Sequence, residues 1–248
     1  MPKVSLITLA MVFVVGSVFG QEVGTDAATA LYRNEMMGGV LFHSQGWGLT
    51  YKRGWHITAT KKRLLEAEYV GMKHPKEKKT INTYNENAKS YFYGKLNSVS
   101  ILRLGAGYQR EITSKDGLDG IELRWLTYGG ASLCFAKPIY LEIIQQPDLI
   151  NEPLRVVPMR YDPTQHFLNN IYGRAPFTKG LSELALHPGL YAKTGLAFEY
   201  GTLQEDVKVI EVGVALDAYM KDVAIMAFQP ARNYFFTFYV SLLYGGKW

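Results

Sequence analysis

The amino-acid sequence predicts an all-β fold, an eight-stranded antiparallel up-and-down β-barrel that crosses a membrane. Three observations predict it: an alternating aromatic strand at the C-terminus, an apolar leader at the N-terminus, and charges confined to one face of most strands. The mean hydropathy of −0.06 is compatible with this fold, because only one face of each barrel strand is apolar. After the leader there is no run of roughly 18 apolar residues, the length that predicts a transmembrane helix.

The C-terminal segment 234–248 alternates with a period of two. Side chains on a strand alternate between its faces, so the even positions share one face. That row is apolar or aromatic from Tyr234 onward and comprises Phe236, Phe238, Val240, Leu242, Tyr244 and Trp248. We expect this face to meet lipid and the strand to govern assembly of the barrel, since transmembrane barrels carry aromatic girdles at both interfaces.

The N-terminal segment predicts export from the cytoplasm. Lys3 is followed by an apolar stretch at 4–15 and by small residues before Gln21. This stretch is too short to span a bilayer and is typical of a cleaved signal peptide. We therefore expect a signal peptide at 1–20, a short periplasmic segment at 21–35 and the barrel at 36–248. Cys134 is the single cysteine, which excludes a disulfide framework.

Eight strands are expected between these limits, and their connections alternate in length. The predicted strands are 36–43, 47–55, 63–73, 95–112, 118–137, 189–201, 207–220 and 233–248. Most of them exceed the roughly 9–11 residues that a tilted strand needs to cross a bilayer. Connections after the second, fourth and sixth strands are short, and those after the third, fifth and seventh are longer. Short periplasmic turns and long outer loops have this asymmetry, which places both termini in the periplasm.

Charged residues fall on the face opposite the apolar one, which predicts a polar lumen. These residues are Lys52, Glu66, Glu68, Arg103, Glu122, Arg124, Lys193, Glu199, Glu211 and Asp217. An eight-stranded barrel encloses a space that side chains fill, so we expect a structural network of ion pairs and no open pore. Glu66 and Glu68 share one face and have an alternative role as a cation site or an acid pair; pairing with Lys52, Arg103 or Arg124 is favoured.

The long connection 138–187 is expected to form one partly helical extracellular loop. It holds six of the ten prolines, which disfavours regular strands. Asp162 and Pro163 predict the start of a short helix over 164–172, and 181–186 is a second candidate for a helical turn. The aromatic residues Tyr161, Phe167, Tyr172 and Phe177 make the loop a candidate docking surface. The alternative is a purely protective cap.

Motifs for catalysis or cofactor binding are weak. His43-Ser44 could belong to a hydrolase site, but no carboxylate stands nearby in the sequence to complete a triad. The other histidines are scattered without metal-ligand spacing, so we expect no catalytic residue, no metal and no cofactor. The net charge of +5 is modest and no basic cluster is interleaved with aromatic residues, so nucleic acid is not an expected partner.

Three segments resemble those of small outer-membrane β-barrels of the Bacteroidota: 46–51, 94–98 and 102–109, together with the C-terminal strand. The resemblance implies a place in the bacterial outer membrane, with membrane lipid, the barrel assembly machinery and other outer-membrane proteins as partners. Such barrels accompany larger machines for protein export, assembly or uptake. The favoured function is therefore a non-enzymatic accessory or structural subunit. The alternatives are a lipid-active outer-membrane enzyme and a narrow pore or ligand receptor.

Overall fold

A computed structural model describes residues 34–58, 60–83, 88–113, 121–145, 155–200 and 206–248. The chain divides into two units, 1–31 and 32–248. The predicted signal peptide at 1–20 lies outside the described residues, as does most of the predicted periplasmic segment at 21–35. Asn34 and Glu35 form the start of the first strand, so the barrel begins earlier than the predicted residue 36.

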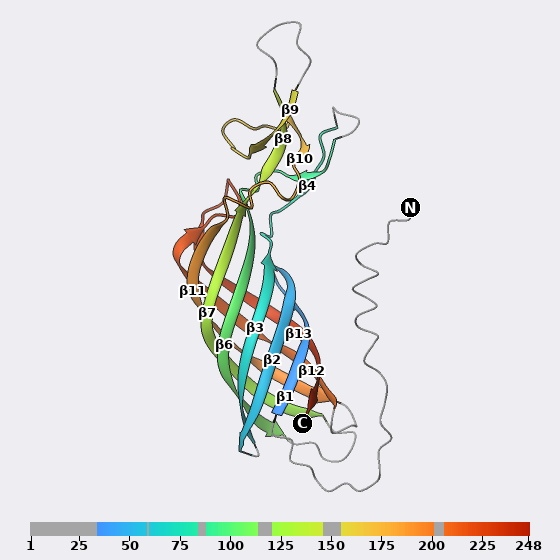
Figure 1. Ribbon diagram of the computed structural model, residues 1–248, viewed down its shortest axis with the longest axis vertical. Helices are drawn as coiled ribbons and strands as arrows, with labels where there is room; N and C mark the ends of the chain where they lie inside the picture. The colour runs from blue at the N-terminus through green and yellow to red at the C-terminus, as the bar shows by residue number, and fades with distance from the viewer. Residues whose placement is uncertain (1–33, 59, 84–87, 114–120, 146–154, 201–205) are drawn as a thin grey trace, which may run out of the picture. The chain divides into compact units, whose positions relative to one another are not determined.

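Eight long strands form a closed antiparallel barrel, as predicted (Figure 1). They are β1 (Asn34–His43), β2 (Gly46–Thr58), β3 (Lys61–Met72), β6 (Asn97–Thr113), β7 (Glu122–Pro138), β11 (Ala185–Tyr200), β12 (Asp206–Val223) and β13 (Arg232–Lys247). Each strand pairs with the next one along the chain. The barrel closes where β1 pairs with β13, from Glu35 opposite Lys247 to His43 opposite Tyr239. Closure leaves no strand edge with unpaired backbone groups.

The strands alternate between an inner and an outer face along their length. In β13 the even positions from Tyr234 to Tyr244 are exposed on the outside, and the odd positions from Phe235 to Leu243 are buried inside. The row that the sequence assigns to lipid is therefore the outer row of the closing strand. Trp248 follows the strand and is also exposed.

The two ends of the barrel differ in their connections. At the end where β1 begins and β13 finishes, the connections are 59–60, 114–121 and 201–205. At the other end they are 44–45, 73–96, 139–184 and 224–231, so three of the four are long. This is the predicted asymmetry, and it collects the long connections at one end (Figure 1).

Five short strands build a cap on the end with the long connections. They are β4 (Lys79–Thr80), β5 (Tyr91–Phe92), β8 (Tyr140–Gln145), β9 (Arg155–Arg160) and β10 (Ile171–Arg174). β4 pairs with β5, and the other three form a sheet in the order β10-β8-β9. Tyr91, Leu141, Ile143, Tyr161 and Ile171 form its buried apolar cluster. The expectation that prolines exclude strands here is wrong, because Pro158 lies in β9, an edge strand that tolerates a missing N–H donor.

The expected helices are also wrong, since the described residues of this connection contain turns and strands but no helix. Local side-chain bonds hold the backbone in turns instead. The Asp162 carboxylate accepts the Thr164 N–H at 2.8 Å, and His166 Nδ1 accepts the Asp162 N–H at 2.9 Å. Such bonds compete with the helical pattern. Ile171 already belongs to β10, and the second candidate segment ends in β11, which begins at Ala185.

Nowhere in the described part of the chain is there a helix long and apolar enough to cross a membrane.

Closure predicts resistance to detergent. A barrel whose strands all pair with neighbours has no edge at which sodium dodecyl sulfate can begin to separate the strands. We expect the unboiled protein to migrate differently from the boiled protein on a denaturing gel. Identical migration, together with recovery of the chain in a soluble fraction, would contradict a membrane barrel.

Candidate functional site

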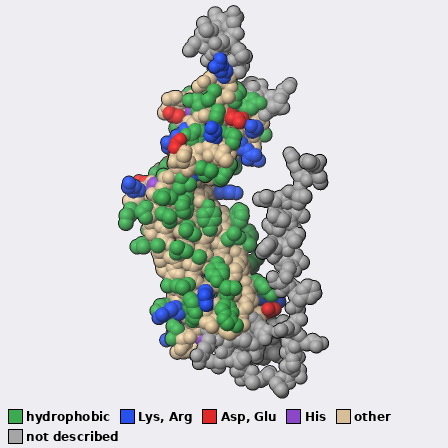
Figure 2. Space-filling model, in the orientation of Figure 1, with side chains coloured by type: hydrophobic (Ala, Val, Ile, Leu, Met, Phe, Trp, Pro, Cys, Tyr) green, Lys and Arg blue, Asp and Glu red, His purple; other side chains and the backbone are tan. Residues whose placement is uncertain are grey.

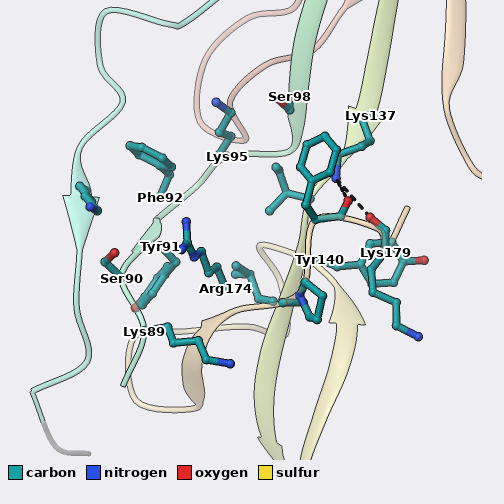
Figure 3. A pocket seen from close by; sticks show the side chains of 16 residues that line it. Lys89, Ser90, Tyr91, Phe92, Lys95, Ser98, Lys137, Tyr140, Arg174 and Lys179 are labelled. Carbon is teal, nitrogen blue, oxygen red and sulfur yellow. Dashed lines mark hydrogen bonds between the residues drawn. The ribbon is translucent and has the colours of Figure 1, made fainter. Parts of the chain in front are cut away.

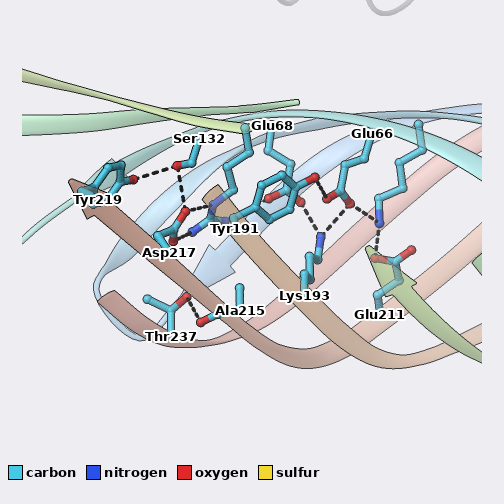
Figure 4. Close-up of polar contacts among 12 residues, drawn as sticks. Glu66, Glu68, Ser132, Tyr191, Lys193, Glu211, Ala215, Asp217, Tyr219 and Thr237 are labelled. Carbon is cyan, nitrogen blue, oxygen red and sulfur yellow. Dashed lines mark hydrogen bonds and ion pairs between the residues drawn. The ribbon is translucent and has the colours of Figure 1, made fainter. Parts of the chain in front are cut away.

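A network of side chains with alternating charge crosses the lumen and links five strands (Figure 4). From the terminal end toward the cap it runs through Glu211, Lys52, Glu66, Lys193, Glu68, Arg103 and Asp217. Every member is buried. The strands supply these side chains because each charge stands at an inward position of a strand whose outward positions are apolar.

Arg103 and Asp217 form the cap-side end of this network. The Arg103 guanidinium binds Asp217 through two hydrogen bonds of 2.9 and 2.6 Å, and it donates a third, of 3.0 Å, to Glu68. The Ser132 hydroxyl donates to Asp217 at 3.0 Å and lies 2.8 Å from the Tyr219 hydroxyl. Bidentate pairing of this kind gives both geometric specificity and strength.

Two lysines join the carboxylates in the middle of the lumen. Lys193 bonds to Glu66 at 2.8 Å and also pairs with Glu68. Lys52 lies 2.9 Å from Glu66 and 2.5 Å from Glu211. Glu66 and Glu68 therefore each face two cations. This arrangement leaves no pair of free carboxylates for a metal ion or for acid–base chemistry.

A second group of ion pairs lies at the terminal end of the lumen. Arg124 bonds to Glu122 at 2.5 and 2.7 Å and pairs with Glu199 at 2.7 Å. Lys247 pairs with Glu199, and Lys62 pairs with Glu35. Glu35, Lys62 and Lys247 were not among the charges predicted for the lumen. The even inward row of β3, which contains Glu66 and Glu68, passes through Lys62 and was the signal that pointed to it.

Strand register brings these partners together. Lys52 stands opposite Glu66 on β2 and β3, and Glu68 stands opposite Arg103 on β3 and β6. Arg103 pairs with Glu68 and also with Asp217 on β12. Glu66 lies one inward position farther from the cap and is matched to Lys52 and Lys193.

Glycine makes room for one of these contacts. A Cβ atom at Gly105 would lie 2.2 Å from the Tyr191 hydroxyl oxygen, closer than atoms can approach. With glycine there, the Tyr191 hydroxyl reaches Glu66 and donates a hydrogen bond of 3.2 Å. The large side chain of Tyr191 thus lies in the part of the lumen where the wall has a glycine and no side chain of its own.

The histidine and cysteine that were considered for chemistry both serve the fold. No group of three His, Cys, Asp or Glu side chains among them could hold a metal ion. His43 Nδ1 accepts the N–H of Gln45 at 3.3 Å across the first turn, so the imidazole serves the turn. Cys134 is buried in an apolar cluster inside the barrel.

The four aromatic residues proposed for docking occupy different environments. Tyr161 is only 4% exposed and belongs to the apolar cluster of the cap. Burial, reinforced by the neighbouring Tyr93, raises the pKa of Tyr161 to about 12, so its hydroxyl stays neutral. Tyr172 is half-buried. Phe167 and Phe177 are 51% and 74% exposed, and these two are accessible to a partner.

The cap also contains a cleft with a strongly basic lining (Figure 3). Its volume is about 550 Å³, and its cationic residues are Lys79, Lys89, Lys95, Lys137, Arg174 and Lys179. No aspartate or glutamate is among the described residues that line it. This cleft was not predicted from the sequence, because its cations come from four separate stretches of the chain and no local pattern unites them.

These features define the class of the protein: a closed eight-stranded antiparallel barrel with an ion-paired lumen, an apolar outer wall and a folded cap. No family model and no curated protein sequence matches the chain.

Solved structures that resemble the fold include the following two. One is Ail, the attachment invasion locus protein of Yersinia pestis, with a TM-score of 0.41 and 7% identity, covering 88% of this chain and 99% of Ail. The other is Neisserial surface protein A, with a TM-score of 0.41 and 8% identity, covering 88% of this chain and 97% of that protein. Neither similarity assigns a function to this chain.

Breaking the lumen network should destabilise the barrel. Arg103→Ala leaves Glu68 and Asp217 short of their shared cation inside the lumen. Removing one partner of a buried pair lowers the free energy of unfolding by about 3 kcal/mol. The matched control is Arg110→Ala, which removes an exposed arginine from the same strand and should change stability by less than about 1 kcal/mol. Urea unfolding in detergent micelles measures both; equal losses would show that the network is not structural.

Proposed function

We propose that this protein is a non-enzymatic barrel of the bacterial outer membrane that acts as an accessory or structural subunit of a larger assembly, export or uptake complex. One observation carries the proposal: the lumen is filled by ion-paired side chains while the cap is folded and exposes apolar residues. A filled lumen disfavours transport through the barrel. The cap is therefore the part of the protein that remains available for interaction.

The outer wall supports a place in a membrane. Figure 2 shows hydrophobic side chains spread over the visible face of it. The exposed large apolar residues of the wall include Leu49, Leu65, Leu104, Leu216, Val240 and Leu242. Apolar patches of this extent are rare on soluble monomers, and lipid removes them from water. Aromatic residues flank the wall, with Trp47 and Phe42 near the cap and Tyr108 and Trp125 near the terminal end.

Outward-facing cations indicate that the terminal end of the wall lies at the interface between membrane and water. The Arg53 guanidinium lies 5.3 Å from the Trp55 ring centre and 6.0 Å from that of Trp248. Arg63 lies 5.8 Å from the Tyr108 ring. Aromatic and basic side chains of this kind sit at the level of lipid headgroups. With the termini on the periplasmic side, the cap lies on the outer surface of the cell.

Exposed apolar residues in the cap support docking of another protein. Phe167 and Leu168 are adjacent in one turn, and both are about half exposed. They lie beyond the barrel, where lipid does not cover them. A pair of this kind forms the core of an interface when a partner buries it.

The outward row of β13 should be required for insertion. Val240 stands between Phe42 and Val212 on the outer wall. Val240→Asp places a carboxylate against lipid, which is unfavourable, so this variant should accumulate in the periplasm and be degraded. The control is Arg232→Asp at the cap end of the same strand, which is already exposed and charged and should insert normally. Fractionation of cells measures both; normal insertion of Val240→Asp would overturn the lipid-facing assignment.

The cap should hold the partner. Purification of the full chain from solubilised outer membranes should yield a complex with one or more outer-membrane proteins in fixed stoichiometry. Phe167→Ser combined with Leu168→Ser should insert normally and lose that complex, because it removes the apolar pair. Lys76→Ser combined with Lys78→Ser, two exposed positions of the same cap, should retain it. Recovery of the wild-type chain alone after mild extraction would contradict the proposed role as a subunit.

A further inference from the structure

Two hollows meet at the rim between the barrel and the cap. The first is the basic cleft described above, of about 550 Å³. The second is a groove of about 720 Å³ on the outer wall below the cap. Both are lined by Lys95, Ser98, Lys137 and Phe177, so they form one continuous hollow.

The cleft carries an excess of positive charge. Two of its six cations have carboxylate partners behind the lining: Lys89 with Glu142 at 3.0 Å, and Lys95 with Glu77 at 2.8 Å. Among the described residues, the other four have no carboxylate within ion-pair distance; they are Lys79, Lys137, Arg174 and Lys179. An excess of this size in a sheltered cleft favours an anion.

Lys137 lies where the cleft meets the groove. It is largely buried, and its ammonium donates hydrogen bonds to the backbone oxygens of Phe177 at 2.8 Å and Lys179 at 3.2 Å (Figure 3). It also lies 4.3 Å from the Phe177 ring centre. These neutral partners orient the ammonium without cancelling its charge. The hydroxyl-bearing residues Ser90 and Ser98 also line the cleft and add hydrogen-bond donors.

The groove is apolar and opens on the lipid-facing wall. Its floor includes the outward side chains of Trp47, Leu49 and Tyr69, which are 56%, 57% and 52% exposed. Phe177 and Leu181 from the cap line its other side. Gly71 keeps the floor open, because it is an outward position without a side chain. An acyl chain of the surrounding bilayer fits a surface of this chemistry.

We propose that this continuous hollow binds one phosphate-bearing lipid of the outer leaflet. The phosphate lies against Lys137, Arg174 and Lys179, and an acyl chain lies in the groove along Trp47 and Tyr69. The inference rests on the proposed membrane location, since the groove faces lipid only in that setting. It adds a class of ligand, a phosphorylated amphiphile, that neither the ion-paired lumen nor the exposed residues Phe167 and Leu168 would predict.

The test uses the full chain purified in a neutral detergent and titrated with diphosphoryl lipid A, with bound lipid counted by native mass spectrometry. The matched probes are the same lipid with its phosphates removed and inorganic phosphate. We expect one tightly bound phosphorylated lipid, at least tenfold weaker binding of the dephosphorylated lipid, and no displacement by inorganic phosphate at millimolar concentration.

Two variants separate the cleft from the groove. Lys137→Gln, Arg174→Gln and Lys179→Gln combined should weaken binding about a hundredfold, since each cation near an anionic lipid contributes roughly fivefold. The control is Lys76→Gln, Lys78→Gln and Lys221→Gln, the same loss of charge at exposed positions outside the cleft. That control should bind as the wild type does.

Gly71→Phe should fill the groove. A Cβ atom there would lie 3.7 Å from the Trp47 backbone oxygen, an ordinary contact, so the barrel accommodates the substitution. Gly38→Phe is the matched control, because Gly38 is outward on β1 and its Cβ would meet only a backbone oxygen at 3.9 Å. Gly71→Phe should weaken lipid binding at least tenfold, and Gly38→Phe should not.

Equal binding by the wild type and the triple Gln variant would overturn the phosphate site. If Gly71→Phe and Gly38→Phe bind the phosphorylated lipid equally well, the groove is not part of the binding site. Gel migration of each variant, with and without boiling, reports the barrel separately. If the wild-type protein is heat-modifiable but binds no phosphorylated lipid, the proposed lipid site is contradicted. The proposed function is then unaffected.

Discussion

Pairing of buried charges inside the lumen is the constraint on which the rest of the structure depends. The interior holds cations such as Arg103 and Lys52, each matched by two carboxylates. Such networks are weak evidence for stability, because desolvation offsets much of the attraction. Their stronger effect is on register: a shift of β6 by one residue would turn Arg103 toward lipid and leave Glu68 and Asp217 without their shared cation.

The same alternation that directs charges inward directs apolar side chains outward. Neither face can change without the other, since successive residues of a strand point to opposite sides. The interior is therefore filled with ion-paired side chains and the outer wall is apolar. The exposed pair Phe167 and Leu168 and the basic cleft both lie at the cap end instead.

The cap is stabilised in a different way from the barrel. Its small sheet is held by an apolar cluster drawn from β5, β8, β10 and Tyr161. That cluster leaves the surrounding polar residues free to line a cleft. In the lumen each of the ten predicted charges has an oppositely charged partner within ion-pair distance, whereas in the cleft Arg174 and Lys179 have none among the described residues. An unbalanced charge is expected where a ligand supplies the balance.

The sequence by itself determined the barrel: eight strands, their inward and outward faces and the ten inward charges follow from a period of two, and the lengths of the segments between strands predict the asymmetric connections. It did not determine the partner of each charge, because Arg103 meets Asp217 only after β12 has closed around the lumen. The cap was beyond sequence reasoning for a related reason. Its strands are short, Pro158 lies in an edge strand, and Asp162 and His166 replace a helix with turns. The cleft arises only when separate segments meet, since no period along the chain records contacts between residues as distant as Lys79 and Lys179.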